Sequence, residues 1–221
     1  MKNKTLWKQV GAAAIAAAMV MSTVPATPVQ AAGGKTLAVS SQKQLNQALK
    51  TVKGKNAVIT VKAGKNVKIT IPKGTYKVTI RVVGKKAAVV NNGTVKEIVV
   101  NSKGTVAIKN NGTIKKVTVQ NAKSVSFSGN HKKAVPVVVN AEDVSMILAA
   151  PAKITAKKDV NIVLKKGAEK SSITCTKNVQ AQVDNQTKKA ISVKIADGTT
   201  LKVESGESCT ITPKGKKEDT S

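Results

Sequence analysis

The tetrapeptide Asn-Asn-Gly-Thr occurs twice in the chain, at residues 91–94 and 110–113. The chain around the two copies consists of short runs rich in Val and Ile, separated by Gly, Asn, Lys and Ser, which is typical of many short strands joined by regular turns. A unit of about 19 residues with two or three short strands is too small to bury its own apolar side. Stacked units bury a continuous core, so the repeat predicts a solenoid.

Apolar residues recur at the same period and form expected internal columns. One column runs through Val106, Val125 and Val144, and a second runs through Ile98, Val117 and Val135. We therefore predict an all-β fold, a right-handed parallel β-helix with coils of about 19 residues over residues 57–212. The expected handedness follows from crossover connections between parallel strands, which are nearly always right-handed. About eight coils fit into this length.

Residues 33–56 precede the coils and contain a predicted helix at 41–53. Leu45, Ala48 and Leu49 fall on one helical face, and Ser41 with Gln44 matches a capping box. Gly54 is expected to end the helix. The helix lies where it can cover the open edge of the first coil. At the other end, residues 213–221 are expected to be a disordered basic and polar tail.

Residues 1–32 are predicted to be a secretory signal peptide. Lys2, Lys4 and Lys8 precede an apolar stretch at residues 10–21, and small residues follow it. The apolar stretch is shorter than the ~20 residues that span a bilayer. We therefore expect a secreted, extracellular protein with no membrane span after cleavage, and retention at the cell wall through charge is a further expectation.

The chain is strongly basic, with a formal net charge of +27. Glu97 is the only acidic residue among the first 141, whereas ten acidic residues follow. A charge of this size predicts attraction to polyanions and repulsion between copies, so we expect a monomer. Tyr76 and Phe127 are the only aromatic residues after the signal peptide, which disfavours recognition of neutral sugars. Specific nucleic-acid binding is disfavoured too, because it relies on base-edge contacts or aromatic stacking.

The sequence resembles the right-handed parallel β-helix proteins of the pectate-lyase-like class. The resemblance lies in the "QLNQALK" helix, the following "NAVITVKAG" and the Val-, Ile- and Asn-rich coils, and it covers about residues 35–212. The chain is also similar to lysine-rich secreted β-helix proteins of Gram-positive bacteria. The resemblance implies the fold, and for the lyases it further implies a calcium-binding carboxylate cluster and a basic residue, here Arg81, that abstracts a proton.

The carboxylates of this chain do not match such a cluster. Calcium takes six to eight oxygen ligands. Glu142 and Asp143 are adjacent and would point to opposite faces of a strand, and no later acidic residues recur at the repeat period. His131 is the only histidine, and we expect it to be an exposed turn residue. We therefore predict no catalytic residues, no metal site and no cofactor. A polysaccharide lyase or hydrolase acting on polyuronate is the alternative.

Two further residue types have structural roles in this prediction. Asn92, Asn111 and Asn130 form an expected ladder in the turns, because Asn tolerates tight turn conformations and its amide can bond to the next Asn along the axis. Cys175 and Cys209 fall about two coils apart, which is too far for a disulfide. We expect them to be unpaired.

The lysines are the best candidates for function. Lys77, Lys96 and Lys115 recur at the period of the turns, so stacked coils would place like charges close together along one edge. The candidate polyanion-binding residues are Lys77, Lys96, Lys115, Lys116, Arg81, Lys132 and Lys133. The expected partner is an anionic extracellular polymer such as acidic polysaccharide, teichoic acid or mucin glycans. A spacer without a ligand, in which lysine only keeps the surface soluble, is the remaining alternative.

Overall fold

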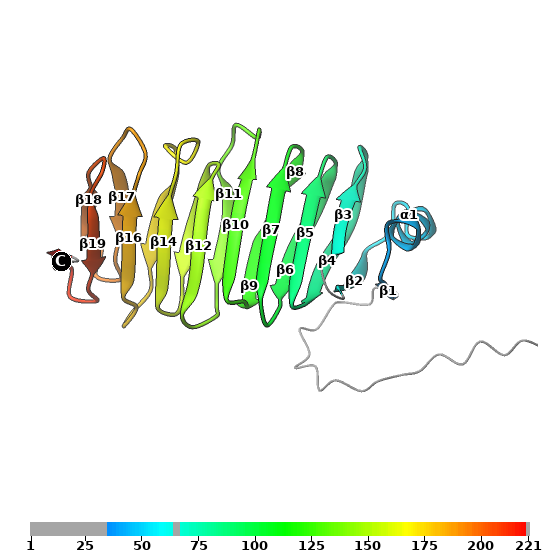
Figure 1. The fold of residues 1–221 in the computed structure, drawn as a ribbon, viewed down its shortest axis with the longest axis horizontal. Helices are drawn as coiled ribbons and strands as arrows, with labels where there is room; N and C mark the ends of the chain where they lie inside the picture. Colours follow the sequence, from blue (N-terminus) through cyan, green and yellow to red (C-terminus); the bar gives the residue numbers. More distant parts are fainter. Residues whose placement is uncertain (1–34, 64–66, 220–221) are drawn as a thin grey trace, which may run out of the picture. The chain divides into compact units, whose positions relative to one another are not determined.

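Two parallel sheets form the body of the molecule. The structure is a computed structural model, which describes residues 35–63 and 67–219. Through the parallel coils its main strands alternate along the chain between the sheets, so each coil contributes one main strand to each sheet (Figure 1). The fold is a β-solenoid of about 8 turns with roughly 19-residue coils, as the repeat predicts. The predicted signal peptide at residues 1–32 lies outside the described residues.

We name the two sheets A and B. In spatial order, sheet A consists of β1 (Lys35–Val39), β2 (Ala57–Ala63), β4 (Thr75–Gly84), β6 (Thr94–Asn101), β9 (Val117–Asn121), β11 (Val135–Val139), β13 (Ala152–Ala156), β15 (Ser172–Cys175), β17 (Ile191–Lys194) and β18 (Thr200–Val203), with β8 (Thr113–Ile114) beside β6. Sheet B consists of β3 (Val67–Ile71), β5 (Lys86–Asn91), β7 (Thr105–Asn110), β10 (Ser124–Gly129), β12 (Val144–Ala149), β14 (Val160–Leu164), β16 (Ala181–Asn185), β19 (Ser208–Ile211) and β20 (Lys217–Asp219).

The core lies between the sheets and is built from alternating side chains. In β4, Val78, Ile80 and Val82 are fully buried, whereas the residues between them face outward and remain partly exposed. Ile80 pairs with Ile98 of β6, which pairs with Val117 of β9. Successive coils lie ~4.8 Å apart in such a ladder, so each inward side chain packs on its counterpart in the next coil.

The predicted columns are correct in the early coils and wrong by two positions in the middle ones. Val106 pairs with Val125 as expected, but the next member of that column is Met146 and not Val144. In sheet A, Val117 pairs with Val137 and not with Val135. The cause is extra turn residues at 130–134 and 140–143, which make these coils longer than the earlier ones. A shift of two positions keeps the same faces buried.

The N-terminal cap contains the predicted helix. Helix α1 (Gln42–Thr51) begins after the N-cap Ser41, whose side chain accepts a hydrogen bond from the Gln44 backbone amide at 3.3 Å. The reciprocal bond reaches one residue further than in a capping box, because Gln44 Oε1 accepts from the backbone amide of Ser40 at 2.7 Å. The helix ends at its C-cap Val52, two residues before Gly54, whose φ is +74°. Strand β1, which pairs with β2, was not predicted.

The C-terminal end differs from the prediction. Parallel coils were expected as far as residue 212, but the chain reverses after β17, so that β18 pairs with β17 and β19 pairs with β16 in antiparallel fashion. The tail at 213–221 was expected to be disordered. Its residues 217–219 instead form β20, antiparallel to β19, and residues 220–221 lie outside the described residues. Figure 1 shows these reversed strands at the end of the row opposite α1.

Candidate functional site

The turns of the solenoid form two edges. We call the turns that lead from sheet B to sheet A the B-to-A edge, and those that lead from sheet A to sheet B the A-to-B edge. Lys77, Lys96 and Lys115 all lie at the B-to-A edge, and all three are exposed. Each follows a member of one paired column, because Tyr76 pairs with Val95 and Val95 pairs with Ile114. The structure therefore brings the three predicted lysines together in consecutive coils.

Local irregularities in the sheet present these lysines to solvent. The pairing of β4 with β6 shifts register between Tyr76 and Thr79, as at a β-bulge. In β6, Val95 and Ile98 are both buried although three positions apart, so the two residues between them are displaced outward. The same backbone feature repeats in the next coil, where two lysines, at positions 115 and 116, separate buried Ile114 from buried Val117. The lysines are thus held at the edge by backbone irregularities that recur from coil to coil.

Lys116 differs from its neighbours because it has an acidic partner. Its Nζ lies 3.7 Å from Oε1 of Glu97, and the same oxygen accepts a 2.6 Å hydrogen bond from the Thr118 hydroxyl. Among the described residues, neither Lys77 nor Lys96 nor Lys115 forms an ion pair. Their charges are therefore available to an external anion, whereas that of Lys116 is shared with Glu97.

Arg81 does not join the lysines. It lies on the outer face of sheet A, between Thr60 and Val99 in the neighbouring strands, four positions along β4 from Lys77. Its side chain is half-buried, and its Nε is enclosed without a hydrogen-bond partner. The position gives Arg81 no share in the lysine column, so we remove it from the candidate site.

Lys132 and Lys133 lie in a later turn of the B-to-A edge and are exposed. The neighbouring His131 was expected to be an exposed turn residue; it lies in the turn, but the expected exposure is wrong. Its ring is half-buried, with Nδ1 3.2 Å from the carbonyl oxygen of Asn110 and Nε2 3.0 Å from that of Pro151. It also meets the Phe127 ring edge-on, with a centroid separation of 5.2 Å. His131 therefore connects coils on either side of its own turn and belongs to the structural framework.

Asparagines form two ladders at the same edge. Asn111 Nδ2 donates to Asn92 Oδ1 at 3.0 Å, which places these two predicted residues side by side along the axis. Asn130 continues the column through its backbone amide, which donates to the Asn110 carbonyl at 3.1 Å. A second ladder was missed: Asn91 and Asn110 are fully buried and joined by a 2.8 Å side-chain hydrogen bond. The sequence does not indicate which Asn of each copy faces inward, because both copies of the repeat begin with two adjacent Asn residues.

The two cysteines lie in different sheets. Cys175 is in β15 of sheet A, and Cys209 is in β19 of sheet B, because the chain reverses before it reaches Cys209. Both side chains are buried, and no disulfide joins them. Burial raises the pKa of the Cys175 thiol to about 11, with a smaller contribution from the negative charge of Asp159. The thiol is therefore held in its unreactive protonated form.

Acidic residues gather at the A-to-B edge of the later coils. Asp143 and Asp159 line the same surface depression together with Gln180 and Gln182. A search for the regular repeat period does not identify this pair, because the coil between the two residues is shorter than the others. Asp159 therefore comes earlier in the chain than a regular coil would place it.

Glu142 at the same edge is already bound by a lysine. Its carboxylate lies 2.7 Å from Lys158 Nζ, and this hydrogen bond lowers the pKa of the Glu142 carboxyl and raises the pKa of the Lys158 ammonium. Among the residues that the structure describes, no group of three or more His, Cys, Asp or Glu side chains is arranged to hold a metal ion.

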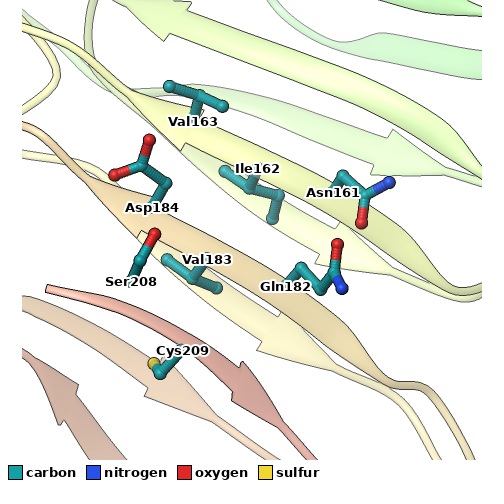
Figure 2. Close-up of a pocket in the computed structure, with 8 residues that line it drawn as sticks. All are labelled: Asn161, Ile162, Val163, Gln182, Val183, Asp184, Ser208 and Cys209. Carbon is teal, nitrogen blue, oxygen red and sulfur yellow. The ribbon is translucent and has the colours of Figure 1, made fainter. Parts of the chain in front are cut away.

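A second depression lies on the outer face of sheet B, where β14, β16 and β19 run side by side (Figure 2). Its polar side chains are Asn161, Gln182, Asp184 and Ser208. The Asp184 carboxylate accepts a 2.6 Å hydrogen bond from Gln186. Ser208 is paired with Asp184 across the sheet, and the chain's only histidine, which could activate a serine hydroxyl, is at the B-to-A edge. This arrangement offers polar contacts but not a nucleophilic centre.

A second lysine column was missed by the sequence analysis. Lys85, Lys103 and Lys123 occupy three consecutive turns of the A-to-B edge, and all three are exposed. The intervals between them are uneven, so a search for one strict period overlooks them. The signal that identifies them is position, because each lies in the short turn that follows a strand of sheet A.

No helix within residues 35–63 and 67–219 is long and apolar enough to cross a membrane. No protein-family model matches the chain, and no curated protein and no solved structure shows significant similarity to it.

Proposed function

We propose that this protein is a secreted, non-enzymatic β-solenoid that binds linear anionic polymers outside the cell by electrostatic attraction. The observation that supports the proposal most directly is that Lys77, Lys96 and Lys115 each follow a member of one paired column at the B-to-A edge and have no acidic partners among the described residues. Like charges stacked at the coil rise of ~4.8 Å repel one another. An anionic chain that lies along the axis relieves this repulsion.

The chemistry of lysine sets the expected mode of binding. A lysine ammonium is a compact charge on a flexible stem and lacks the planar fork with which Arg selects one geometry. Binding should therefore be sensitive to salt and tolerant of polymer type, with acidic polysaccharide, teichoic acid and sulfated or sialylated glycans as the candidate partners. DNA should bind without sequence preference, because its phosphates supply the same attraction.

The proposal is tested with the mature protein and heparin as the probe. Each lysine that neutralises an anionic group releases about one counter-ion, so the logarithm of affinity falls linearly with the logarithm of salt concentration. The variant with Lys77→Gln, Lys96→Gln and Lys115→Gln should bind at least tenfold more weakly and show a slope shallower by about 2 to 3. The control variant carries Lys188→Gln, Lys194→Gln and Lys202→Gln, which removes the same charge from the last coils. Equal losses in both variants, or no salt-sensitive binding by the unmodified protein, would refute the proposed site.

The enzymatic alternative is tested separately. The unmodified protein is incubated with polygalacturonate, with and without calcium, and unsaturated product is followed by ultraviolet absorbance. Sustained turnover would replace the non-enzymatic proposal with a lyase. A protein that neither binds polyanions nor turns them over would leave the spacer alternative.

A further inference from the structure

The A-to-B edge carries the second column, formed by Lys85, Lys103 and Lys123. Main-chain hydrogen bonds hold its turns together: the Thr105 amide donates to the Lys85 carbonyl at 3.0 Å, and the Lys123 amide donates to the Gly104 carbonyl at 2.9 Å. Successive turns are therefore stacked like the strands that they connect, about 4.8 Å apart. No ion pair involves these three lysines in the part of the chain that the structure describes.

Gly104 explains why the spacing of this column is uneven. Residue 104 is the one in register with Lys85, because Thr105 pairs with Lys86. A Cβ atom at position 104 would lie 1.8 Å from the Lys85 carbonyl oxygen, so no side chain fits there. The lysine of that turn stands one position earlier, at 103. The three lysines nevertheless occupy three consecutive turns of the same edge.

The column has a defined end. The turn that follows Lys123 at this edge contains Glu142 and Asp143, so the sign of the charge reverses in the next coil. An anionic chain that lies along this edge meets one lysine in each of three consecutive turns and then Asp143, beside Glu142 that Lys158 already neutralises. Among the turns that the structure describes, the A-to-B edge therefore carries a lysine track as long as the column formed by Lys77, Lys96 and Lys115.

A straight polymer chain that lies along one column does not reach the other column. Lys77 and Lys85 stand at opposite ends of β4, eight positions apart, which corresponds to about 26 Å at a rise of ~3.3 Å per residue. The Debye length at physiological ionic strength is about 8 Å. An anionic chain that neutralises one edge therefore leaves the charge of the other edge almost unchanged.

We propose that the two edges bind separate polymer chains, so that one molecule bridges two linear polyanions. This inference rests on the proposed function and adds a second binding track to it. Both tracks present one ammonium group per coil, so each suits a chain whose anionic groups recur at about the coil rise of ~4.8 Å. Such a protein would link polymer chains into a network without self-association.

The test measures stoichiometry and bridging with heparin as the probe. A heparin octasaccharide is titrated into the protein, and the number bound is obtained by calorimetry and native mass spectrometry. Long-chain heparin is then mixed with the protein at matched charge, and light scattering reports networks of several chains. We expect two octasaccharides per molecule, and scattering far above that of either component alone.

Variants separate the two tracks. One carries Lys85→Gln, Lys103→Gln and Lys123→Gln, and the other carries Lys77→Gln, Lys96→Gln and Lys115→Gln. Each should bind one octasaccharide and lose the network scattering, whereas the control with Lys188→Gln, Lys194→Gln and Lys202→Gln should keep both properties. Circular dichroism verifies that every variant keeps its β structure.

The outcomes distinguish this inference from the proposed function. One octasaccharide per unmodified molecule, with an unaltered A-to-B variant, overturns bridging while binding at the B-to-A edge stands. Network scattering that survives in both edge variants also overturns it, because bridging would then not depend on the two columns. Absence of any heparin binding overturns both proposals together.

Discussion

Gln42 in the first turn of α1 forms two hydrogen bonds with the main chain of Thr70 in β3. Its Oε1 accepts from the Thr70 amide at 2.7 Å, and its Nε2 donates to the Thr70 carbonyl at 2.8 Å. Strand β3 is the last strand of sheet B at this end, so its outer main-chain groups have no further strand to pair with. The amide of Gln42 reproduces the bonds of a missing neighbour and closes the edge.

We predict that Gln42→Ala lowers the stability of the first coil by about 1 to 3 kcal/mol, because it removes both partners of a partly buried main-chain pair. The stability of Gln42→Glu should lie between those of Gln42→Ala and the unmodified protein. Its carboxylate accepts a hydrogen bond from the Thr70 amide but has no proton to donate to the Thr70 carbonyl. Urea unfolding and hydrogen exchange at residues 67–71 measure the effect. Identical stability of all three proteins would contradict the edge-capping role.

Gly104 should be intolerant of any side chain. The predicted cost of Gly104→Ala is about 3 kcal/mol, because the new Cβ would overlap the Lys85 carbonyl and force the two turns apart. Gly198→Ala is the matched control: its φ of +95° is unfavourable for Ala, but no atom lies within 4 Å of the new Cβ. The control should lose only about 1 to 2 kcal/mol, as measured by thermal unfolding. Equal losses would mean that the close approach at position 104 is not the cause.

His131 should contribute stability through its ring nitrogens rather than its shape. His131→Phe keeps the contact with Phe127 but removes the ring nitrogens that face the carbonyl oxygens of Asn110 and Pro151. We expect a loss of about 1 to 2 kcal/mol for His131→Phe and a larger one for His131→Ala, from the midpoint of urea unfolding. If His131→Phe is as stable as the unmodified protein, ring packing alone accounts for the residue.

Cys175 should react slowly with thiol reagents in the folded protein. Burial raises its pKa from 9.0 to about 11, so only a very small fraction is thiolate at pH 8. Alkylation measured by mass spectrometry should accelerate as the pH approaches 11, and upon unfolding in guanidinium at pH 8. The folded chain holds this proton more tightly than the unfolded chain. The contribution of the protonated thiol to the free energy of unfolding is therefore complete below about pH 9 and is lost as the pH rises toward 11. Rapid native labelling at pH 8 would contradict this environment.

Glu97 should weaken polyanion binding in the unmodified protein. It is the only acidic residue in the first 141, and it pairs with Lys116 at the B-to-A edge. Glu97→Gln keeps an oxygen that can accept from the Thr118 hydroxyl but frees the charge of Lys116 and removes a repulsive carboxylate. We expect heparin affinity to rise about three- to tenfold at low salt, with a steeper salt dependence. Glu207→Gln, which frees Lys217 in the last coils, is the control that should change little; an equal rise in both would assign the effect to net charge alone.

The sequence was sufficient to predict the solenoid because internal ladders impose regular spacing. The columns through Ile98 and Val117, and through Val106 and Val125, follow directly from the repeat period. The prediction failed where spacing is not constrained by stacking. Turns at the edges accept extra residues, which moved the column from Val144 to Met146.

The candidate site was predicted in part for the same reason. Lys77, Lys96 and Lys115 share a face because they follow core positions at a constant interval. Lys85, Lys103 and Lys123 lie in turns of variable length, so they do not recur at the repeat period. Asp143 and Asp159 line the same depression but are separated by a shortened coil, so their spacing also differs from the period. The contacts of His131 depend on two carbonyls far from it in sequence, which periodicity does not reveal.

The antiparallel strands at the C-terminal end give the molecule a fixed termination point. A coil added after β17 would have no parallel strand to continue, because β18 and β19 already occupy those positions. Growth by duplication is therefore confined to the interior, where a copied unit between β5 and β10 meets neighbours of its own kind. Each such duplication would add one coil and, with it, one lysine at each edge. The length of this solenoid and its positive charge would therefore increase together, by one coil at a time.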